Sequence, residues 1–228
     1  MKQRDRQILL QAALDQPDLH QILQLGSVLG QEADILEIGS APIMKYGMLP
    51  VEELRKQQPD LVVLADVKIM DAGARSAKVC FEAGADIVTV LGAAGDTTIR
   101  EVISTAKRYG GHVMIDLIQV KNLAVRAEKL DGMGADWMCV HAASDTQGPE
   151  ETENDVFAEL EILQRVLKET GTAIAGGIDF DSALRLAEMK PDVVIAGKVI
   201  TQGQEPASAA RKLKKLLNPA GGTDSRSA

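Results

Sequence analysis

The sequence predicts an α/β fold, a single-domain (β/α)8 TIM barrel, from three observations. Eight short apolar runs recur along the 228 residues, and amphipathic stretches of helical period lie between many of them. Aromatic residues make up only 3%, so Ala, Val, Ile and Leu must fill the core, as in a tightly packed parallel barrel. A doubly wound open sheet is the alternative, but no GxGxxG motif follows the first apolar run.

The apolar runs are expected to be strands because each is too short for a helix and is rich in β-branched residues or flanked by turn residues. They span residues 8–14, 34–38, 61–65, 86–90, 112–116, 136–140, 172–176 and 192–197. The first run is the least regular because Gln11 interrupts it. Asp34, Asp86 and Asp136 follow alanine at the start of a run, at intervals of about 50 residues, which is a weak repeat of two βα units.

The amphipathic stretches are expected to be helices, and the clearest span residues 77–84, 96–110, 122–134 and 155–171. Gly84, Gly110, Gly134 and Gly171 stand where a helix C-cap is expected. No linker or low-complexity insertion divides the chain, so the barrel is predicted to span residues 1–217. Residues 218–228 contain Pro, Gly and Ser without apolar periodicity and are predicted to form a disordered tail.

Charge and composition exclude several classes of partner. The net charge of −8 argues against broad binding to nucleic acid or to an anionic membrane, but it leaves room for a local pocket for an anionic metabolite. No apolar run approaches the length of about 20 residues that crosses a bilayer. Cys80 and Cys139 have no CxxC spacing and are expected to be reduced core thiols. A cytoplasmic protein is therefore expected.

Ionisable residues stand where five of the predicted strands end. Asp66 and Lys68 follow the third run, and strand side chains alternate with a period of two, so both are expected to point into the mouth of the barrel. Two buried charges of this kind need partners, because burying them unpaired costs several kcal/mol. The residues expected beside them at the other strand ends are Asp15, Glu37, Asp116 and His141.

Such a cluster predicts a divalent cation with oxygen ligands, most naturally Mg²⁺. A lysine within reach would add a positive charge and a proton donor, and an imidazole would exchange protons near neutral pH. Each residue alone has a simpler structural interpretation: a single Asp after a strand is more often a helix N-cap, which fits Asp15 in particular. Their occurrence together on one rim favours a functional site.

The last two strands end differently, in glycines. Gly176 and Gly177 end the seventh run, and Gly197 and Lys198 follow the eighth. The loops after strands seven and eight are the usual phosphate site of this barrel, because glycines let backbone N–H groups approach phosphate oxygens. Lys198 would add a point charge. These residues predict a phosphorylated substrate.

The sequence also resembles a known family. "LADVKIMDAG" fits the D-x-K-x-x-D signature of the orotidine 5′-monophosphate decarboxylase superfamily. "LEIGSAPIMKYG", "FEAGADIVTVLGAA", "DLIQVKNLAVRAEKL", "VHAASDTQ" and "AGGI" are similar to its branch of 3-hexulose-6-phosphate synthases and 3-keto-L-gulonate-6-phosphate decarboxylases. The resemblance runs from about residue 8 to residue 217, nearly the whole chain.

The resemblance implies a role for each residue at the predicted mouth. Mg²⁺ would bind Glu37 and Asp66, and Lys68 would contact the enediolate oxygens of the substrate. His141 would move protons at the substrate carbon. The remaining substrate-binding residues would be Asp15, Asp116, Gly176, Gly177, Gly197 and Lys198.

The resemblance also implies a homodimer. The acid matching Asp71 crosses the dimer interface in this family and enters the catalytic site of the partner. Asp71 is therefore expected to act in catalysis with Asp66, Lys68 and His141, although it would do so in the other subunit.

Two branches of the family must be separated. The decarboxylases usually carry an H-R-x-R-D pattern after the sixth strand, whereas here Ala142 and Ser144 stand at the two arginine positions, which favours the synthase. Lys198 points the other way, because the synthases commonly have a neutral residue there. The predicted function is a carbon–carbon lyase of aldolase type that condenses formaldehyde with D-ribulose 5-phosphate to D-arabino-3-hexulose 6-phosphate, reversibly, through a Mg-stabilised enediolate. The alternatives are the 3-keto-L-gulonate-6-phosphate decarboxylase and a non-catalytic barrel that binds a sugar phosphate.

Overall fold

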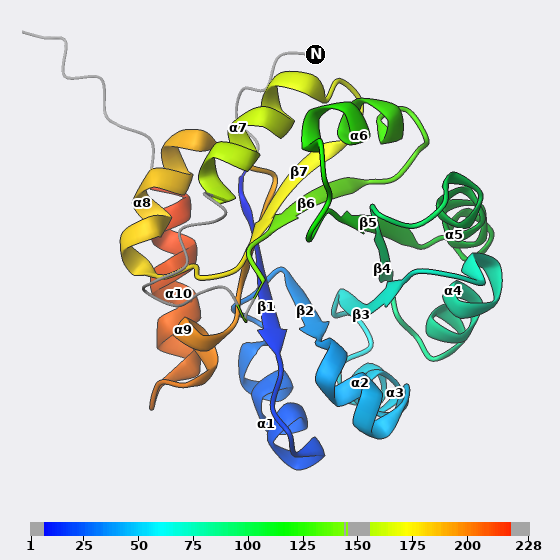
Figure 1. Ribbon diagram of the computed structural model, residues 1–228. Coiled ribbons are helices and arrows are strands. Elements are labelled where there is room, and N and C mark those ends of the chain that lie inside the picture. Colours follow the sequence, from blue (N-terminus) through cyan, green and yellow to red (C-terminus); the bar gives the residue numbers. More distant parts are fainter. Residues whose placement is uncertain (1–6, 144, 146–155, 220–228) are drawn as a thin grey trace, which may run out of the picture.

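Eight parallel strands close into a barrel in the order β1 to β8 (Figure 1). The structure is a computed structural model and describes residues 7–143, 145 and 156–219. The predicted TIM barrel is thereby confirmed, with all eight strands near their expected positions. The strands are β1 (Leu9–Leu14), β2 (Ile35–Ile38), β3 (Val63–Ile69), β4 (Ile87–Leu91), β5 (His112–Asp116), β6 (Trp137–His141), β7 (Gly171–Ala175) and β8 (Val193–Ala196).

Helices surround the strands and cover the outside of the barrel (Figure 1). They are α1 (Leu19–Leu29), α2 (Ser40–Tyr46), α3 (Leu49–Gln57), α4 (Gly73–Glu82), α5 (Asp96–Tyr109), α6 (Leu123–Leu130), α7 (Val156–Val166), α8 (Phe180–Met189), α9 (Lys198–Thr201) and α10 (Pro206–Leu217). The last helix, α10, packs against α1 and β1 and so joins the two ends of the chain. Asn218 completes the join, since its side chain accepts a hydrogen bond from the backbone N–H of Ile8 at 2.8 Å.

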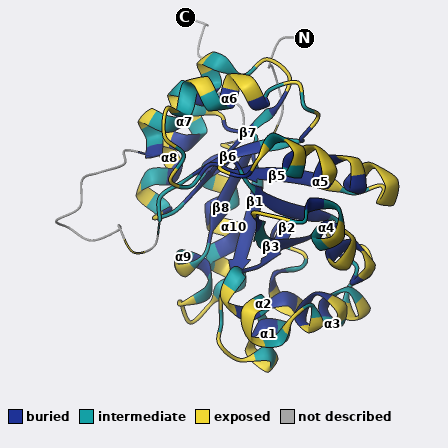
Figure 2. Cartoon of the chain, turned by 45° about the vertical axis from the view of Figure 1, so that its right-hand side comes forward, coloured by how far each residue is buried: buried dark blue, intermediate teal, exposed yellow. Residues whose placement is uncertain are grey.

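The core has two parts because strand side chains alternate between the two faces of the barrel wall. Outward side chains pack under the helices, and both faces of the strands are therefore buried, as Figure 2 shows in dark blue. Inward side chains form a small separate cluster that fills the barrel. The ten members of this inner cluster are Ala13, Ile35, Leu64, Ile87, Met114, Cys139, Ala173, Ala175, Val193 and Ile195.

The aspartates before β2, β4, β6 and β8 explain the weak repeat in the sequence. Asp34 accepts a hydrogen bond from the backbone N–H of Leu10 in the preceding strand at 2.9 Å. The equivalent bonds from the other three odd-numbered strands are those of Val63 to Asp86, Val113 to Asp136 and Thr172 to Asp192. Each pair of βα units is therefore fastened in the same way at the amino-terminal end of the barrel.

Several local expectations need correction. Gly110 does cap α5 in a left-handed conformation, with φ of 70°. Gly171, however, begins β7, because α7 already ends at Val166. The helices α2 and α3 occupy residues 40–46 and 49–57, between two predicted strands, in a stretch that is not among the clearest amphipathic ones. No helix in the described part of the chain is long and apolar enough to cross a membrane. Most of the predicted tail, residues 220–228, lies outside the described residues.

Candidate active site at the carboxyl end of the barrel

A cavity of about 420 Å³ opens at the carboxyl ends of the strands. Several of the residues that line it stand two positions beyond a residue of the inner cluster and so point the same way. Ile35 is followed inward by Glu37, Leu64 by Asp66, Met114 by Asp116 and Cys139 by His141. Strand parity therefore aims these side chains into the barrel mouth. The predicted residues that line this one cavity are Asp15, Glu37, Asp66, Lys68, Asp116, His141, Gly176, Gly177, Gly197 and Lys198.

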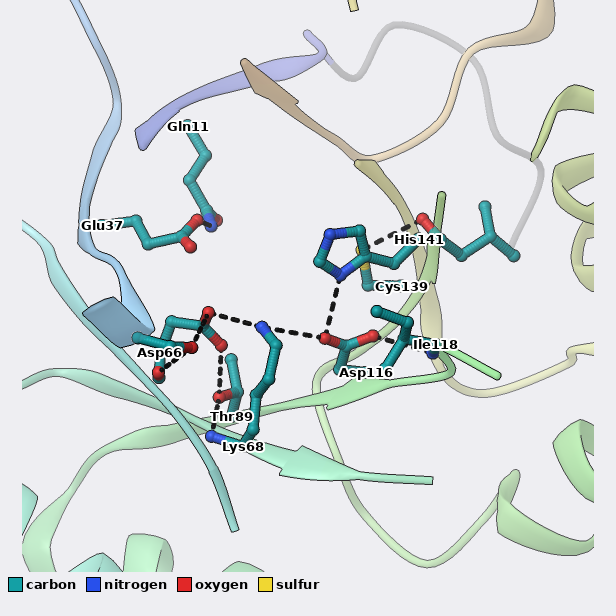
Figure 3. Close-up of polar contacts among 11 residues, drawn as sticks. Gln11, Glu37, Asp66, Lys68, Thr89, Asp116, Ile118, Cys139 and His141 are labelled. Carbon is teal, nitrogen blue, oxygen red and sulfur yellow. Dashed lines mark hydrogen bonds and ion pairs between the residues drawn. The ribbon is translucent and has the colours of Figure 1, made fainter. Parts of the chain in front are cut away.

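Four charged or ionisable side chains form a continuous chain across the cavity (Figure 3). The ammonium nitrogen of Lys68 lies 2.5 Å from Asp66 Oδ2 and 3.3 Å from Asp116 Oδ2. Asp116 Oδ2 is in turn 3.0 Å from Nδ1 of His141. The chain therefore joins β3, β5 and β6 through one lysine and one histidine.

The ionisation states in this chain follow from the contacts. Burial by itself lowers the pKa of Lys68, but the charges of Asp66 and Asp116 outweigh it and hold that pKa above its ordinary value. Burial is the largest single influence and raises the pKa of Asp116, but the hydrogen bond with His141 and the charges of His141 and Lys68 together outweigh it and hold that pKa below its ordinary value. An ionised Asp116 accepts the Nδ1 proton of His141, so that Nε2 is the nitrogen able to accept a proton from a substrate.

Glu37 is the buried carboxyl group on the other side of Asp66. Its Oε2 accepts a hydrogen bond from Gln11 Nε2 at 2.5 Å. Burial and the neighbouring negative charge of Asp66 raise the pKa of Glu37 to about 8. The same two causes raise the pKa of Asp15. Carboxyl groups are thus crowded on this side of the cavity, and the raised pKa values mean that, without a cation, Glu37 and Asp15 hold their protons more tightly than usual.

A divalent cation would favour the ionised form of these crowded carboxyl groups, and Glu37 and Asp66 are oxygen donors of the kind that Mg²⁺ takes. Within residues 7–143, 145 and 156–219, no three His, Cys, Asp or Glu side chains converge as a site built entirely from protein would require. Mg²⁺ usually binds through one or two carboxylates and keeps the remaining positions for water and substrate. The two carboxylates present therefore fit this ion, and its binding stays a prediction.

Three polar residues of the site were not predicted from the sequence. Thr89 of β4 donates a hydrogen bond to Asp66 Oδ1 at 2.8 Å, and Ser40 of α2 donates to Asp66 Oδ2 at 2.8 Å. Gln11, which looked like an interruption of the first strand, is buried and holds Glu37. A neutral polar residue inside an apolar strand was the available signal, and it marks all but Ser40.

The glycines after β7 and β8 line the same cavity as the carboxylates of β2 and β3. Gly176 and Gly177 have positive φ angles of 95° and 69°, which glycine adopts without strain. A Cβ on Gly176 would lie only 2.4 Å from the carbonyl oxygen of Ala142, so no side chain fits there. Lys198 follows Gly197 at the start of α9 and faces the same cavity.

Asp71 is the predicted catalytic residue that the structure does not bring into this cavity. It lies past the end of β3, exposed, and lines a second groove with Met48, Met70 and Val79, which Lys68 also borders. Its position is compatible with the prediction that it serves the site of another subunit.

Comparison with known proteins agrees with the fold. Residues 9–213 match the model of the orotidine 5′-phosphate decarboxylase / HUMPS family. A Bacillus subtilis protein named 3-hexulose-6-phosphate synthase is 40% identical over 208 residues, which cover 91% of this chain and 98% of that protein. The crystal structure of 3-hexulose-6-phosphate synthase from Salmonella typhimurium is 35% identical with a TM-score of 0.87, covering 92% of this chain and 98% of that one.

A decarboxylase is similar at lower identity. The crystal structure of 3-keto-L-gulonate-6-phosphate decarboxylase from Vibrio cholerae is 26% identical with a TM-score of 0.81, covering 92% of this chain and 97% of that one. The resemblance that the motifs indicated, to enzymes of the synthase branch, is confirmed by the names and identities of these relatives. The chain belongs to the orotidine 5′-phosphate decarboxylase / HUMPS family.

Proposed function

We propose that this protein is a 3-hexulose-6-phosphate synthase, a carbon–carbon lyase that joins formaldehyde to D-ribulose 5-phosphate and runs reversibly. The observation that carries the proposal is the chain from Asp66 through Lys68 and Asp116 to His141. This chain places the ammonium group of Lys68 and the imidazole of His141 in one cavity, which glycines also line. The 40% identity to a protein of that name over 91% of the chain supports it.

The proposed chemistry begins with a proton transfer. Nε2 of His141 takes a proton from carbon 1 of ribulose 5-phosphate, and the electron pair moves toward the carbonyl oxygen to give an enediolate. Lys68 donates a hydrogen bond to the developing negative charge. Carbon 1 then attacks formaldehyde, and the proton held by His141 passes to the formaldehyde oxygen. Asp116 stabilises the imidazolium that exists between the two transfers.

Glu37 and Asp66 would hold Mg²⁺. When bound there, the ion would supply a Lewis acid for the carbonyl and hydroxyl oxygens of the substrate. Gln11 fixes the carboxylate of Glu37, and Ser40 and Thr89 fix that of Asp66, so both donors are oriented by hydrogen bonds from uncharged side chains.

The remaining predicted residues would bind the parts of the substrate that lie far from the reacting carbon. The N–H groups around Gly176, Gly177 and Gly197 would bind the phosphate with Lys198, while Asp15 would accept from substrate hydroxyl groups. Holding both ends would fix carbon 1 against His141 and would raise the rate by orientation.

We also propose a cytoplasmic homodimer in which Asp71 enters the catalytic site of the partner. The support is the exposed apolar surface around Asp71, where Met70 is 53% and Val79 is 52% exposed. Side chains of this type gathered around a groove favour a protein interface over free solvent.

The alternative activity is that of the related decarboxylases, which the cationic Lys198 favours. Both activities need the same enediolate, so one pair of assays separates them. Purified protein with ribulose 5-phosphate should consume formaldehyde, and with 3-keto-L-gulonate 6-phosphate it should release carbon dioxide slowly or not at all. The opposite result would assign the protein to the decarboxylases, and inactivity in both assays would favour a binding protein.

A further inference from the structure

Thr89 is a buried polar residue that was not predicted from the sequence, and the proposed chemistry uses only its hydrogen bond to Asp66. It lies in β4, two positions beyond the inward core residue Ile87, and its side chain therefore enters the cavity. Only 4% of its surface is exposed. A buried hydroxyl needs hydrogen-bond partners, and those of Thr89 are the two residues at the centre of the site.

The hydroxyl of Thr89 links Asp66 to Lys68. It donates to Asp66 Oδ1 at 2.8 Å and accepts from the backbone N–H of Lys68 at 2.9 Å (Figure 3). A hydroxyl has one hydrogen to donate and lone pairs that accept, so both bonds form at once. Ser40 differs, because the hydrogen bonds of its hydroxyl group both go to Asp66: one to Oδ2 and one to the backbone oxygen.

The backbone at Lys68 needs this support. Lys68 has a φ of +46°, a left-handed conformation that a residue with a side chain adopts at a cost. The register between β3 and β4 shifts between Ala65 and Ile69, so the ladder is interrupted at Lys68. Its N–H therefore goes to the side chain of Thr89 and not to a backbone carbonyl of β4.

This irregularity sets where the ammonium group lies. A left-handed residue in place of an extended one redirects the Lys68 side chain, which then spans from Asp66 to Asp116. Two features of Lys68 are thus held through one hydroxyl group: its backbone directly, and its ammonium partner Asp66 through the bond to Oδ1.

We propose that Thr89 is a positioning residue that sets Lys68 and Asp66 in their working geometry. The proposal rests on the proposed lyase function, since it assigns Thr89 a share in that reaction without contact with the substrate. The phosphate end of the cavity is built from other strands, so Thr89 should govern the rate of turnover and not the binding of ribulose 5-phosphate.

The test compares three variants with the wild-type protein. Thr89→Val keeps the branched shape and removes the hydroxyl, while Thr89→Ser restores the hydroxyl. Thr105→Val is the matched control, because Thr105 is also a buried threonine, and its hydroxyl accepts from Arg108 on α5, away from the cavity. Thermal unfolding of each variant establishes that it folds. Two quantities are then measured: steady-state formaldehyde consumption, and the hydrogen-exchange rate of the Lys68 amide in the protein without substrate.

The proposal expects kcat of Thr89→Val to fall by about 10- to 100-fold with the KM for ribulose 5-phosphate changed by less than about threefold. The Lys68 amide should exchange at least about tenfold faster in that variant. Thr89→Ser should recover most of both quantities, and Thr105→Val should resemble the wild type.

The proposal is overturned if Thr89→Val retains wild-type kcat and Lys68 protection, if Thr89→Ser does not recover them, or if Thr105→Val loses as much activity. Failure of the proposed function would look different. The wild-type protein itself would then consume no formaldehyde, and the exchange of the Lys68 amide would still decide whether Thr89 holds that backbone.

Discussion

At the scale of single residues, the chain contains two histidine–aspartate pairs at opposite ends of neighbouring strands. His141 Nδ1 lies 3.0 Å from Asp116 at the carboxyl end of β5 and β6. His112 Nδ1 lies 2.8 Å from Asp136 at the amino end of the same two strands. Both pairs join a histidine Nδ1 to an aspartate, but only His141 and Asp116 line the cavity. Each is therefore the natural control for the other.

We expect His141→Asn to lower kcat by about 100-fold or more, because general acid–base catalysis contributes roughly that factor or above. Asparagine keeps a hydrogen-bond donor for Asp116 but cannot accept a proton at the reaction pH. The measurement is kcat for formaldehyde consumption, with thermal unfolding to verify the fold. His112→Asn should leave kcat within about twofold, and an equal loss in both variants would refute the assigned role.

Glu37 gives the metal-free protein a distinctive pH dependence. Its pKa is raised from 4.5 to about 8, so the folded chain binds a proton that the unfolded chain releases between these values. Stability from this group is therefore complete below pH 4.5 and is lost as the pH rises to about 8.

The slope attributable to Glu37 should not exceed about 1.4 kcal/mol per pH unit. Urea unfolding of chelator-treated protein from pH 5 to pH 9 measures it, and Glu37→Gln should remove it. A variant whose profile matched the wild type would show that Glu37 is ionised like an ordinary carboxyl group.

The charged residues of the site could be predicted because ionisable side chains stand at the ends of several apolar strands, and their occurrence together on one rim has no simple structural explanation. Glu37, Asp66, Lys68, Asp116 and His141 all met that criterion, and all line the cavity. The left-handed backbone of Lys68 could not be predicted, because it depends on the register of β3 against β4. The hydrogen-bond partners of the charged groups could not be predicted for the same reason, because they depend on which residues the strand register brings side by side.

At the scale of elements, the aspartates before the even-numbered strands fasten the barrel at the end away from the site. Asp34 shows the arrangement most fully. It accepts from the N–H of Leu10 at 2.9 Å and binds Lys214 of α10 at 2.6 Å. Asp60 also precedes a strand, β3, but it is exposed and does not follow this pattern. Substitutions at the amino-terminal end of the barrel should therefore change stability, and substitutions at the carboxyl end should change activity.

Asp34→Ala should lower the free energy of unfolding by about 1–3 kcal/mol, because it leaves the N–H of Leu10 without its acceptor. Urea denaturation measures this change, and kcat at 25 °C should stay near the wild-type value. Asp60→Ala is the control and should change stability by less than about 0.5 kcal/mol. A large loss of kcat in Asp34→Ala would contradict the separation of the two barrel ends.

The strands were predictable as elements because they are buried on both faces, so that most of their residues are apolar even where Gln11 interrupts β1 and Thr89 interrupts β4. β3 is longer than its apolar run of 61–65, since Asp66 and Lys68 belong to the strand although they are charged. The end of α7 was misjudged because the apolar pattern continues into Leu167, beyond the last helical residue Val166. Periodicity locates elements well and their ends less well.

At the scale of the whole molecule, the central question is whether one chain contains a complete site. The cavity holds Lys68 but not Asp71, which is exposed in a groove with Met70 and Val79. In the proposed homodimer each site combines Lys68 of one subunit with Asp71 of the other. Such a site can be rebuilt from two inactive variants.

Lys68→Ala and Asp71→Asn should each abolish most activity alone. Mixing them after subunit exchange should restore about a quarter of wild-type activity, because half of the dimers are mixed and each has one intact site. The measurement is formaldehyde consumption of the mixture, with size-exclusion chromatography to follow the dimer. Mixtures that stay inactive while mixed dimers form would place both residues in the same subunit's site.

The most direct test of the account is whether formaldehyde consumption with ribulose 5-phosphate depends on a divalent ion held by Glu37 and Asp66. The protein is treated with excess chelator, assayed, and assayed again after Mg²⁺ is returned in excess. The account predicts that activity disappears with the chelator, returns with Mg²⁺, and does not return in Glu37→Gln. Full activity in the presence of chelator would contradict it.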